Sequence, residues 1–242
     1  MIHYHGTPVG GSRAQAAEFL ITKHALVPFF HPKDLPIVAE VCQSFCLDNS
    51  AYSIWRQGGT LDVDGYIEWV EKWHLHPRFD FAFIPDSIEG DADDNDRLLK
   101  SWPSHLNGVP VWHPHEPIDR LKRLCDSWRR VAIGGSPVYN QIGSANWWNR
   151  IGMAMDAICD KEGRPPCKLH GLRMLDPAIF TKLPLSSGDS VNAARNNGNK
   201  NGWGYYRPPT AAQRATVIAA RIEAHTSAST WERIDQMEFS LT

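Results

Sequence analysis

Short apolar runs recur along the chain, at intervals that leave room for a helix between them. They predict strands at 2–5, 25–30, 44–48, 79–84, 109–113, 130–134, 168–172 and 183–187. Apolar positions three or four residues apart predict helices at 12–20, 34–43, 64–74, 92–102, 117–128, 144–161, 176–182 and 209–225. Alternating strands and helices indicate a parallel sheet. The pattern in 242 residues therefore predicts an α/β fold, a (β/α)8 TIM-like barrel forming a single domain over residues 1–242.

The alternative arrangement is an open, doubly wound sheet. Such sheets that bind dinucleotides carry the spacing G-x-G-x-x-G after the first strand. The segment GTPVGG at 6–11 lacks that spacing, which favours the barrel. One low-complexity stretch, NNGNKNGWG at 196–204, predicts a flexible loop.

Composition and charge limit the possible partners and cellular compartment of the protein, but they do not identify a reaction. Apolar residues make up 42% of the chain, which is enough for a sizeable core, and the formal net charge is −2. A nucleic-acid partner would therefore need a local basic patch. The five cysteines are scattered without a C-x-x-C pair, as expected of free thiols in a reducing cytoplasm. The first residues do not resemble a signal peptide, and no membrane span is expected.

Polar residues and glycines collect where the predicted strands end. In a parallel barrel these ends meet at one face, which is where active sites lie. Three aspartates from three different strands would then share one pocket, and crowded like charges are usually kept for chemistry. The residues at these ends are His3, His5, Asp48, Asp86, His113, His115, Glu116, Gly134, Gly135, His170 and Asp189.

A metal-dependent hydrolase is one interpretation of these strand ends. His3 and His5 follow the H-x-H pattern that opens such barrels, and His113, His170 and Asp189 could complete a zinc site. Alternate residues of a strand point to the same side, however, so His3 and His5 could simply share the barrel interior. The other ligands also do not stand at the usual strand ends.

Read in order, five segments resemble the tRNA-guanine transglycosylase superfamily. DNSAY at 48–52 stands where that family has D-S-G-G-F, and FIPDS at 83–87 ends strand four in an aspartate. AIGGSPV at 132–138 matches the Gly-Gly turn, HGLRM at 170–174 matches the seventh strand, and GDSVNAARN at 188–196 is similar to the segment of the nucleophilic aspartate. The resemblance covers about residues 1–200 and implies an enzyme, a pentosyltransferase that exchanges guanine for a 7-deazaguanine on a (β/α)8 barrel.

The chain also departs from that family. No cysteine follows Cys167, so the zinc-binding subdomain is missing, and the chain is shorter than the tRNA enzymes. A short member without zinc is most similar to the phage-type DNA 7-deazaguanine transglycosylases, as is the opening YHGTPVGG at 4–11. The resemblance implies a host-cytoplasmic enzyme that inserts a base such as preQ0 into DNA, without cofactor or metal.

The resemblance implies a role for each strand end. Asp189 is the nucleophile that attacks C1′, and Asp48 is the general acid and base. Asp86 accepts hydrogen bonds from N1–H and the 2-amino group of guanine. Tyr52 replaces a stacking phenylalanine and could equally be a packing residue. The remaining substrate-binding candidates are His113 for the base carbonyl, Gly134 and Gly135 for close backbone approach, His170 on strand seven and Met174 for the second base face.

A guanine inside a duplex must be flipped out before it can reach these groups. The segment 191–207 is basic, aromatic and free of acids, which suits a loop that grips nucleic acid, although a surface loop without function would look the same. Its candidate contacts are Arg195, Lys200, Trp203, Tyr205 and Arg207. The expected partners are double-stranded DNA with a flipped guanine and the free 7-deazaguanine base. A homo-oligomer or accessory protein remains open, as do a tRNA or nucleoside substrate, the metal-dependent hydrolase and a barrel that only binds nucleic acid.

Overall fold

Nine parallel strands form one sheet in the computed structural model, which describes residues 1–10 and 12–233. Gly11 and the last nine residues of the predicted 1–242 domain lie outside the described residues. The strand order is β5-β4-β3-β2-β1-β9-β8-β7-β6. The strands are β1 (Ile2–Gly6), β2 (His24–Pro28), β3 (Ser44–Asp48), β4 (Phe79–Phe83), β5 (Gly108–Val109), β6 (Val111–Trp112), β7 (Arg130–Ile133), β8 (Lys168–Gly171) and β9 (Ser187–Ser190).

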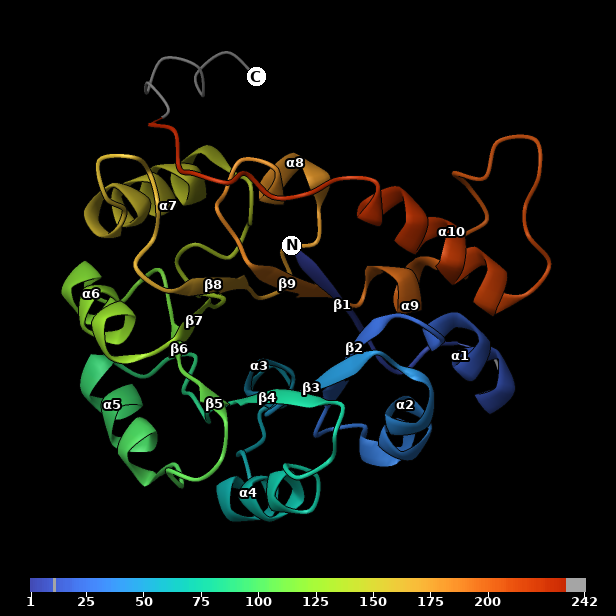
Figure 1. Cartoon of the computed structure of the whole chain (residues 1–242), viewed down its shortest axis with the longest axis horizontal. Helices are drawn as coiled ribbons and strands as arrows, with labels where there is room; N and C mark the ends of the chain where they lie inside the picture. Colours follow the sequence, from blue (N-terminus) through green and yellow to red (C-terminus); the bar gives the residue numbers. More distant parts are fainter. Residues whose placement is uncertain (11, 234–242) are drawn as a thin grey trace.

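The sheet curls until its two edges almost meet at Pro110. The edge strands β5 and β6 are consecutive in the chain, and only this proline separates them. Proline has no N–H to donate to a ladder, which interrupts the strand at this point. The Pro110 carbonyl still accepts the N–H of Ala132 at 2.9 Å. The result is a nearly closed, barrel-like parallel sheet (Figure 1).

Helices surround this sheet on its outer side, and most follow a strand (Figure 1). Side chains cap several of them, as at Asp91, which accepts the N–H groups of Asp93 and Asp94 at the start of α5. The helices are α1 (Arg13–Leu20), η1 (Pro32–Asp34), α2 (Leu35–Val41), α3 (Ala51–Trp55), α4 (Val63–Glu71), α5 (Ala92–Ser101), α6 (Ile118–Ser127), α7 (Ala145–Ile158), α8 (Pro177–Phe180), α9 (Asn192–Asn196) and α10 (Ala211–Glu223).

The core has an inner part and two outer parts. Inside the barrel, Tyr4, Phe81 and Phe83 are buried together. The outer clusters lie between strands and helices: one includes Phe19 and Tyr66, and the other includes Trp147. Because successive side chains of a strand point to opposite faces, each buried strand contributes to both layers. Its ends are then fixed from both sides, which holds any strand-end group in place.

Most predicted strands and helices are observed within a few residues of their expected bounds. The exceptions are the strand predicted at 109–113, which is broken at Pro110 into β5 and β6, and the last strand. The prediction placed the last strand at 183–187, but β9 spans Ser187–Ser190. Leu183 and Leu185 belong instead to an outer core cluster. The real strand has almost no apolar residues, yet it pairs with β1 on one side and β8 on the other. Asp189 therefore lies within a central strand, not after it.

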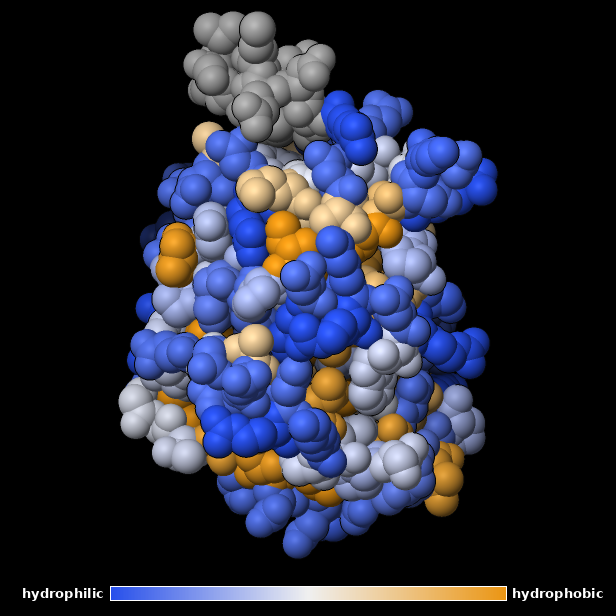
Figure 2. All heavy atoms as spheres, turned by 90° about the vertical axis from the view of Figure 1, so that its left-hand side faces the viewer, coloured by the Kyte–Doolittle hydropathy of each residue, from blue (hydrophilic) through white to orange (hydrophobic). Residues whose placement is uncertain are grey.

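Two short helices occupy segments that the pattern treats as loops. Helix α3 begins directly after the DNS triplet, and α9 forms the first part of the predicted flexible loop 191–207. Among the described residues, no helix is long and apolar enough to cross a membrane. The face that carries α5, α6 and α7 is mostly hydrophilic, with separate hydrophobic spots (Figure 2).

Candidate active site

Three aspartates from β3, β4 and β9 meet at the carboxyl end of the sheet. Asp48 is the last residue of β3, Asp86 follows β4, and Asp189 lies in β9 with 4% of its surface exposed. Burial, and then the charges of Asp189 and Asp86, raise the pKa of Asp48 from its ordinary 3.8 to about 7. The carboxylates are thus close enough to affect one another, and Asp48 is able to gain or lose a proton near neutral pH.

Asp189 is held by donors on β8 and on the segment after it. His170 Nε2 lies 3.2 Å from Asp189 Oδ1, and the backbone N–H of Arg173 donates to the same oxygen at 3.1 Å. The other ring nitrogen of His170 lies 2.9 Å from the Ser187 hydroxyl. Burial lowers the pKa of His170, so the ring is neutral, with Nε2–H donating to Asp189 and Nδ1 accepting from Ser187. The His170 ring and the Arg173 N–H therefore both bind Asp189 Oδ1.

Asp86 is held by Asn49 and His113. Asn49 Nδ2 donates to Asp86 Oδ1 at 2.8 Å and to the Ile84 carbonyl at 2.9 Å, while its Oδ1 accepts the N–H of Ala51. The second oxygen of Asp86 lies 3.0 Å from His113 Nε2. That contact is a close charge pair without hydrogen-bond alignment, since Nε2 has no hydrogen-bond partner.

The charge state of His113 follows from its two neighbours. Its Nδ1 lies 2.6 Å from the Gly135 carbonyl, which only accepts, so Nδ1 carries a proton. A lone pair on Nε2 would then face a carboxylate. Burial opposes charge on the ring, but Asp86 outweighs it, and the pKa of His113 is raised. Asp86 thus favours the imidazolium form of His113, and both ring nitrogens face groups of the protein.

The segment DNSAY forms a tight turn that aims Asp48 and Asn49 into the site. Ser50 has a φ of 64°, in the left-handed region that few residues other than glycine adopt. Its hydroxyl accepts the Phe30 N–H at 3.1 Å and lies 3.4 Å from Asp48 Oδ2. The turn therefore exists without the two glycines of the family motif.

Tyr52 and Arg173 approach each other across the barrel mouth. Tyr52 lies on α3 after β3, and Arg173 follows β8, which three strands separate from β3 in the sheet. The Arg173 guanidinium carbon lies 3.9 Å from the centre of the Tyr52 ring. Arg173 also has a positive φ of 59°. A contact with Arg173 is the largest cause that lowers the pKa of Tyr52.

The other predicted base contacts are occupied by the protein itself. The Gly134 N–H donates to the Trp112 carbonyl at 2.8 Å, and the Gly135 carbonyl faces His113. A Cβ on Gly134 would lie 2.6 Å from Val111, so close packing requires glycine there. Met174 is fully buried in an outer core cluster and fills space between strands and helices.

His3 and His5 do not join this site. Tyr4, between them, faces the barrel interior, so both histidines point outward and do not share the interior. His5 Nε2 lies 2.8 Å from Glu223 on α10, and the His3 ring packs against Phe180 on α8. Within residues 1–10 and 12–233, no group of three or more His, Cys, Asp and Glu side chains is arranged to hold a metal ion. The zinc set drawn from His3, His5, His113, His170 and Asp189 is therefore wrong.

The predicted nucleic-acid contacts lie on α9 and the segment after it, next to β9. Arg195, Lys200, Tyr205 and Arg207 are exposed, and Trp203 is half-buried. The Trp203 ring N–H donates to the Asn199 carbonyl at 2.7 Å, and Arg207 donates to the Gly198 carbonyl at 3.1 Å. In the part of the chain that the structure describes, none of the three cations has a carboxylate partner.

Asn49 and Arg173 are the site residues that the sequence did not single out. Asn49 entered the sequence analysis only as part of DNSAY, although a polar residue directly after a buried strand is a usable signal. Arg173 is a charge within the apolar segment HGLRML, which was a weaker signal.

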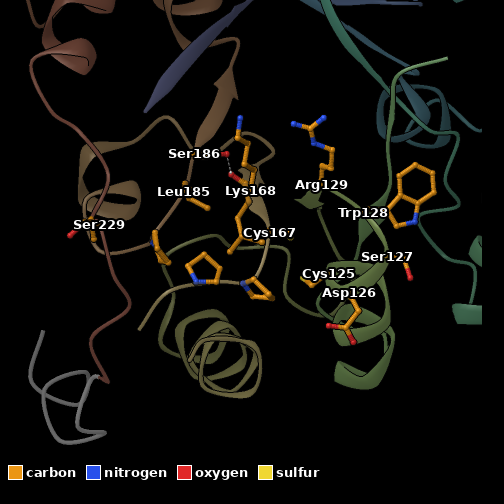
Figure 3. A pocket seen from close by; sticks show the side chains of 15 residues that line it. Cys125, Asp126, Ser127, Trp128, Arg129, Cys167, Lys168, Leu185, Ser186 and Ser229 are labelled. Atoms are coloured by element: carbon orange, nitrogen blue, oxygen red, sulfur yellow. Dashed lines mark hydrogen bonds between the residues drawn. The ribbon is translucent and has the colours of Figure 1, made fainter. Parts of the chain in front are cut away.

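An open cleft of about 690 Å³ lies at the opposite end of the barrel. Its walls include Arg129 and Lys168, which stand at the starts of β7 and β8, and the thiols of Cys125 and Cys167 (Figure 3). It is therefore separate from the three aspartates at the strands' carboxyl ends.

Comparison of the chain with protein-family models, with curated proteins and with solved structures found no match.

Proposed function

We propose that the protein is a DNA-guanine transglycosylase, which exchanges guanine in DNA for a 7-deazaguanine base such as preQ0. The observation that carries the proposal is the pairing of a fixed carboxylate with one that titrates near pH 7. Asp189 is held through one oxygen by His170 and the Arg173 N–H, and Asp48 has a pKa of about 7. In this proposal β5 and β6 count as one strand interrupted at Pro110, which makes the sheet a (β/α)8 barrel.

The exchange proceeds in two displacements at C1′ of the deoxyribose. Asp189 Oδ2 forms a bond to C1′ while the bond from C1′ to guanine breaks, and the departing base takes a proton from Asp48. The incoming base then loses a proton to Asp48 and attacks C1′, and the ester bond to Asp189 breaks. Atoms and charges balance, and Asp48 ends as it began. A group with a pKa near the working pH suits both proton transfers.

Asp86 supplies base recognition in this scheme. Asn49 and His113 each face one oxygen of Asp86, which fixes the orientation of the carboxyl group. A carboxylate has further lone pairs, and these accept N1–H and the 2-amino group of guanine. Adenine has neither of these donors, so the proposal predicts that it is not exchanged.

The nucleic-acid partner is supported by the exposed cations of the segment that follows β9. Arg195, Lys200 and Arg207 lie directly after the strand that carries Asp189, in a stretch without acids. Such a surface attracts a phosphate backbone. The flipped guanine would enter the barrel mouth next to it.

The test is to incubate the protein with duplex DNA and preQ0, digest the DNA and weigh its nucleosides by mass spectrometry. The proposal expects the deazaguanine deoxynucleoside with the native protein and none with Asp189→Ala. Parallel reactions with tRNA and with free deoxyguanosine distinguish DNA from the other substrates of the superfamily. Exchange that is undiminished in Asp189→Ala and Asp48→Asn would overturn the mechanism.

A further inference from the structure

The side chain of Arg173 lies where a flat ligand would stack on Tyr52. The guanidinium carbon is 3.9 Å from the centre of the ring, and a guanidinium is itself planar. A Cβ on Gly135 would lie 2.8 Å from a terminal nitrogen of Arg173. The arginine therefore reaches from β8 across the mouth and fills the space between the β3 and β7 loops.

The backbone of Arg173 explains how it reaches this position. Its φ of 59° is rare for a residue with a large side chain, and such conformations persist where the surroundings impose them. The same conformation directs its N–H to Asp189 Oδ1 at 3.1 Å. One residue thus fixes the carboxylate with its backbone and covers the entrance with its side chain. In the described part of the chain the guanidinium pairs with no carboxylate, so no ion pair must break when it moves.

We propose that Arg173 is a specificity-determining residue, whose guanidinium covers the ring of Tyr52 until a flat heterocycle takes its place. This inference rests on the proposed function, because it assumes that the site receives a purine-like base. A ligand must then stack on tyrosine better than a guanidinium does in order to enter. Flat aromatic bases meet that condition, whereas sugars and small acids do not.

The test measures binding of free 7-deazaguanine by calorimetry to the native protein and to Arg173→Asn. Asparagine tolerates a positive φ, so the backbone contact to Asp189 is kept while the guanidinium is lost. A cation–π contact is worth a factor of roughly 2 to 30 in an equilibrium, so the variant should bind the base about 2- to 30-fold more tightly. Arg164→Asn removes the same charge from an exposed position away from the site and should leave the dissociation constant unchanged.

Repeating the measurement in a Tyr52→Leu variant tests whether Arg173 competes with the base for the tyrosine ring. In Tyr52→Leu the ring is absent, so base binding should weaken, and adding Arg173→Asn should then produce no further gain. Equal or weaker binding in Arg173→Asn would overturn this inference while leaving the proposed function standing. A gain of the same size in the Tyr52→Leu background would also overturn it, since the competition would not be for the ring. If neither the native protein nor any variant bound the base, the proposed function itself would fail.

Discussion

Replacing Asp48 with asparagine should make the folded protein more stable at alkaline pH. Burial and the charges of Asp189 and Asp86 raise the pKa of Asp48 from 3.8 to about 7, so the ionised form is disfavoured in the folded state. Below about pH 4 the Asp48 carboxyl is protonated in both the folded and the unfolded state, so its burial does not lower the free energy of unfolding through charge. Between about pH 4 and pH 7 the unfolded chain ionises Asp48 while the folded protein keeps it protonated, so the free energy of unfolding falls across this range and the loss is complete above about pH 7. An asparagine side chain has almost the same shape and never carries the charge.

The shift sets the size of the effect. A rise from 3.8 to about 7 corresponds to about 4 kcal/mol at most. Asp48 is only partly buried, and solvent screening reduces the effect, so about 2 kcal/mol is the better expectation. For a domain of this size, that is a rise of about 4–8 °C in the thermal midpoint.

The assay is a series of thermal unfolding curves between pH 5 and pH 8.5 for the native protein, for Asp48→Asn and for Asp119→Asn. Asp119 lies on α6 with its side chain 83% exposed, so its replacement should shift the midpoint little at any pH. The advantage of Asp48→Asn should be largest at pH 8.5 and should shrink steadily towards pH 5. Midpoints of Asp48→Asn equal to those of the native protein throughout, or a loss of stability at pH 8.5, would show that the folded protein does not disfavour an ionised Asp48.

Three further variants test other parts of the site and its support. Asn49→Ala leaves an oxygen of Asp86 without its donor, so unfolding should become easier by about 1–3 kcal/mol and KM for the base should rise; an unchanged KM would show that Asp86 needs no such support. Arg120→Met strips the fully buried Glu116 of its cation, and a loss of about 3–5 kcal/mol in a denaturant titration is expected, whereas a neutral result would mean that the pair is not desolvated. Lys200→Ala should weaken DNA binding and lower the salt dependence of the binding constant by about one counterion, and an unaltered salt slope would place the DNA elsewhere.

The strands with apolar interiors could be located from the sequence, and β3 was placed to the residue. Their burial on both faces requires continuous apolar runs, which the pattern detects. Strand β9 escapes this pattern, because SGDS has no apolar run. That strand is held by ladders to β1 and β8, and its small residues allow close packing: a Cβ on Gly188 would lie 2.9 Å from Met1. Pairing of this kind depends on distant segments and leaves no local signal.

Some residues of the site could likewise be predicted from the sequence, and others could not. The positions of Asp48 and Asp86 could be predicted because each ends a recognisable strand. The roles of Asn49 and Arg173 could not, because both depend on contacts between loops far apart in the chain. His113 was predicted to contact the base, but its two nitrogens face Asp86 and Gly135. Which polar group faces which partner is decided by side-chain geometry, and spacing along the sequence does not encode it.

A covalent intermediate would identify the nucleophile of the proposed exchange. The protein is mixed with a guanine-containing duplex oligonucleotide, quenched in denaturant and analysed by intact-mass spectrometry followed by peptide mapping. We expect a protein–DNA adduct with an ester between the Asp189 carboxylate and C1′ of a deoxyribose that has lost guanine, and no adduct with Asp189→Ala. An adduct on a different residue, or full base exchange by Asp189→Ala, would show that Asp189 is not the nucleophile.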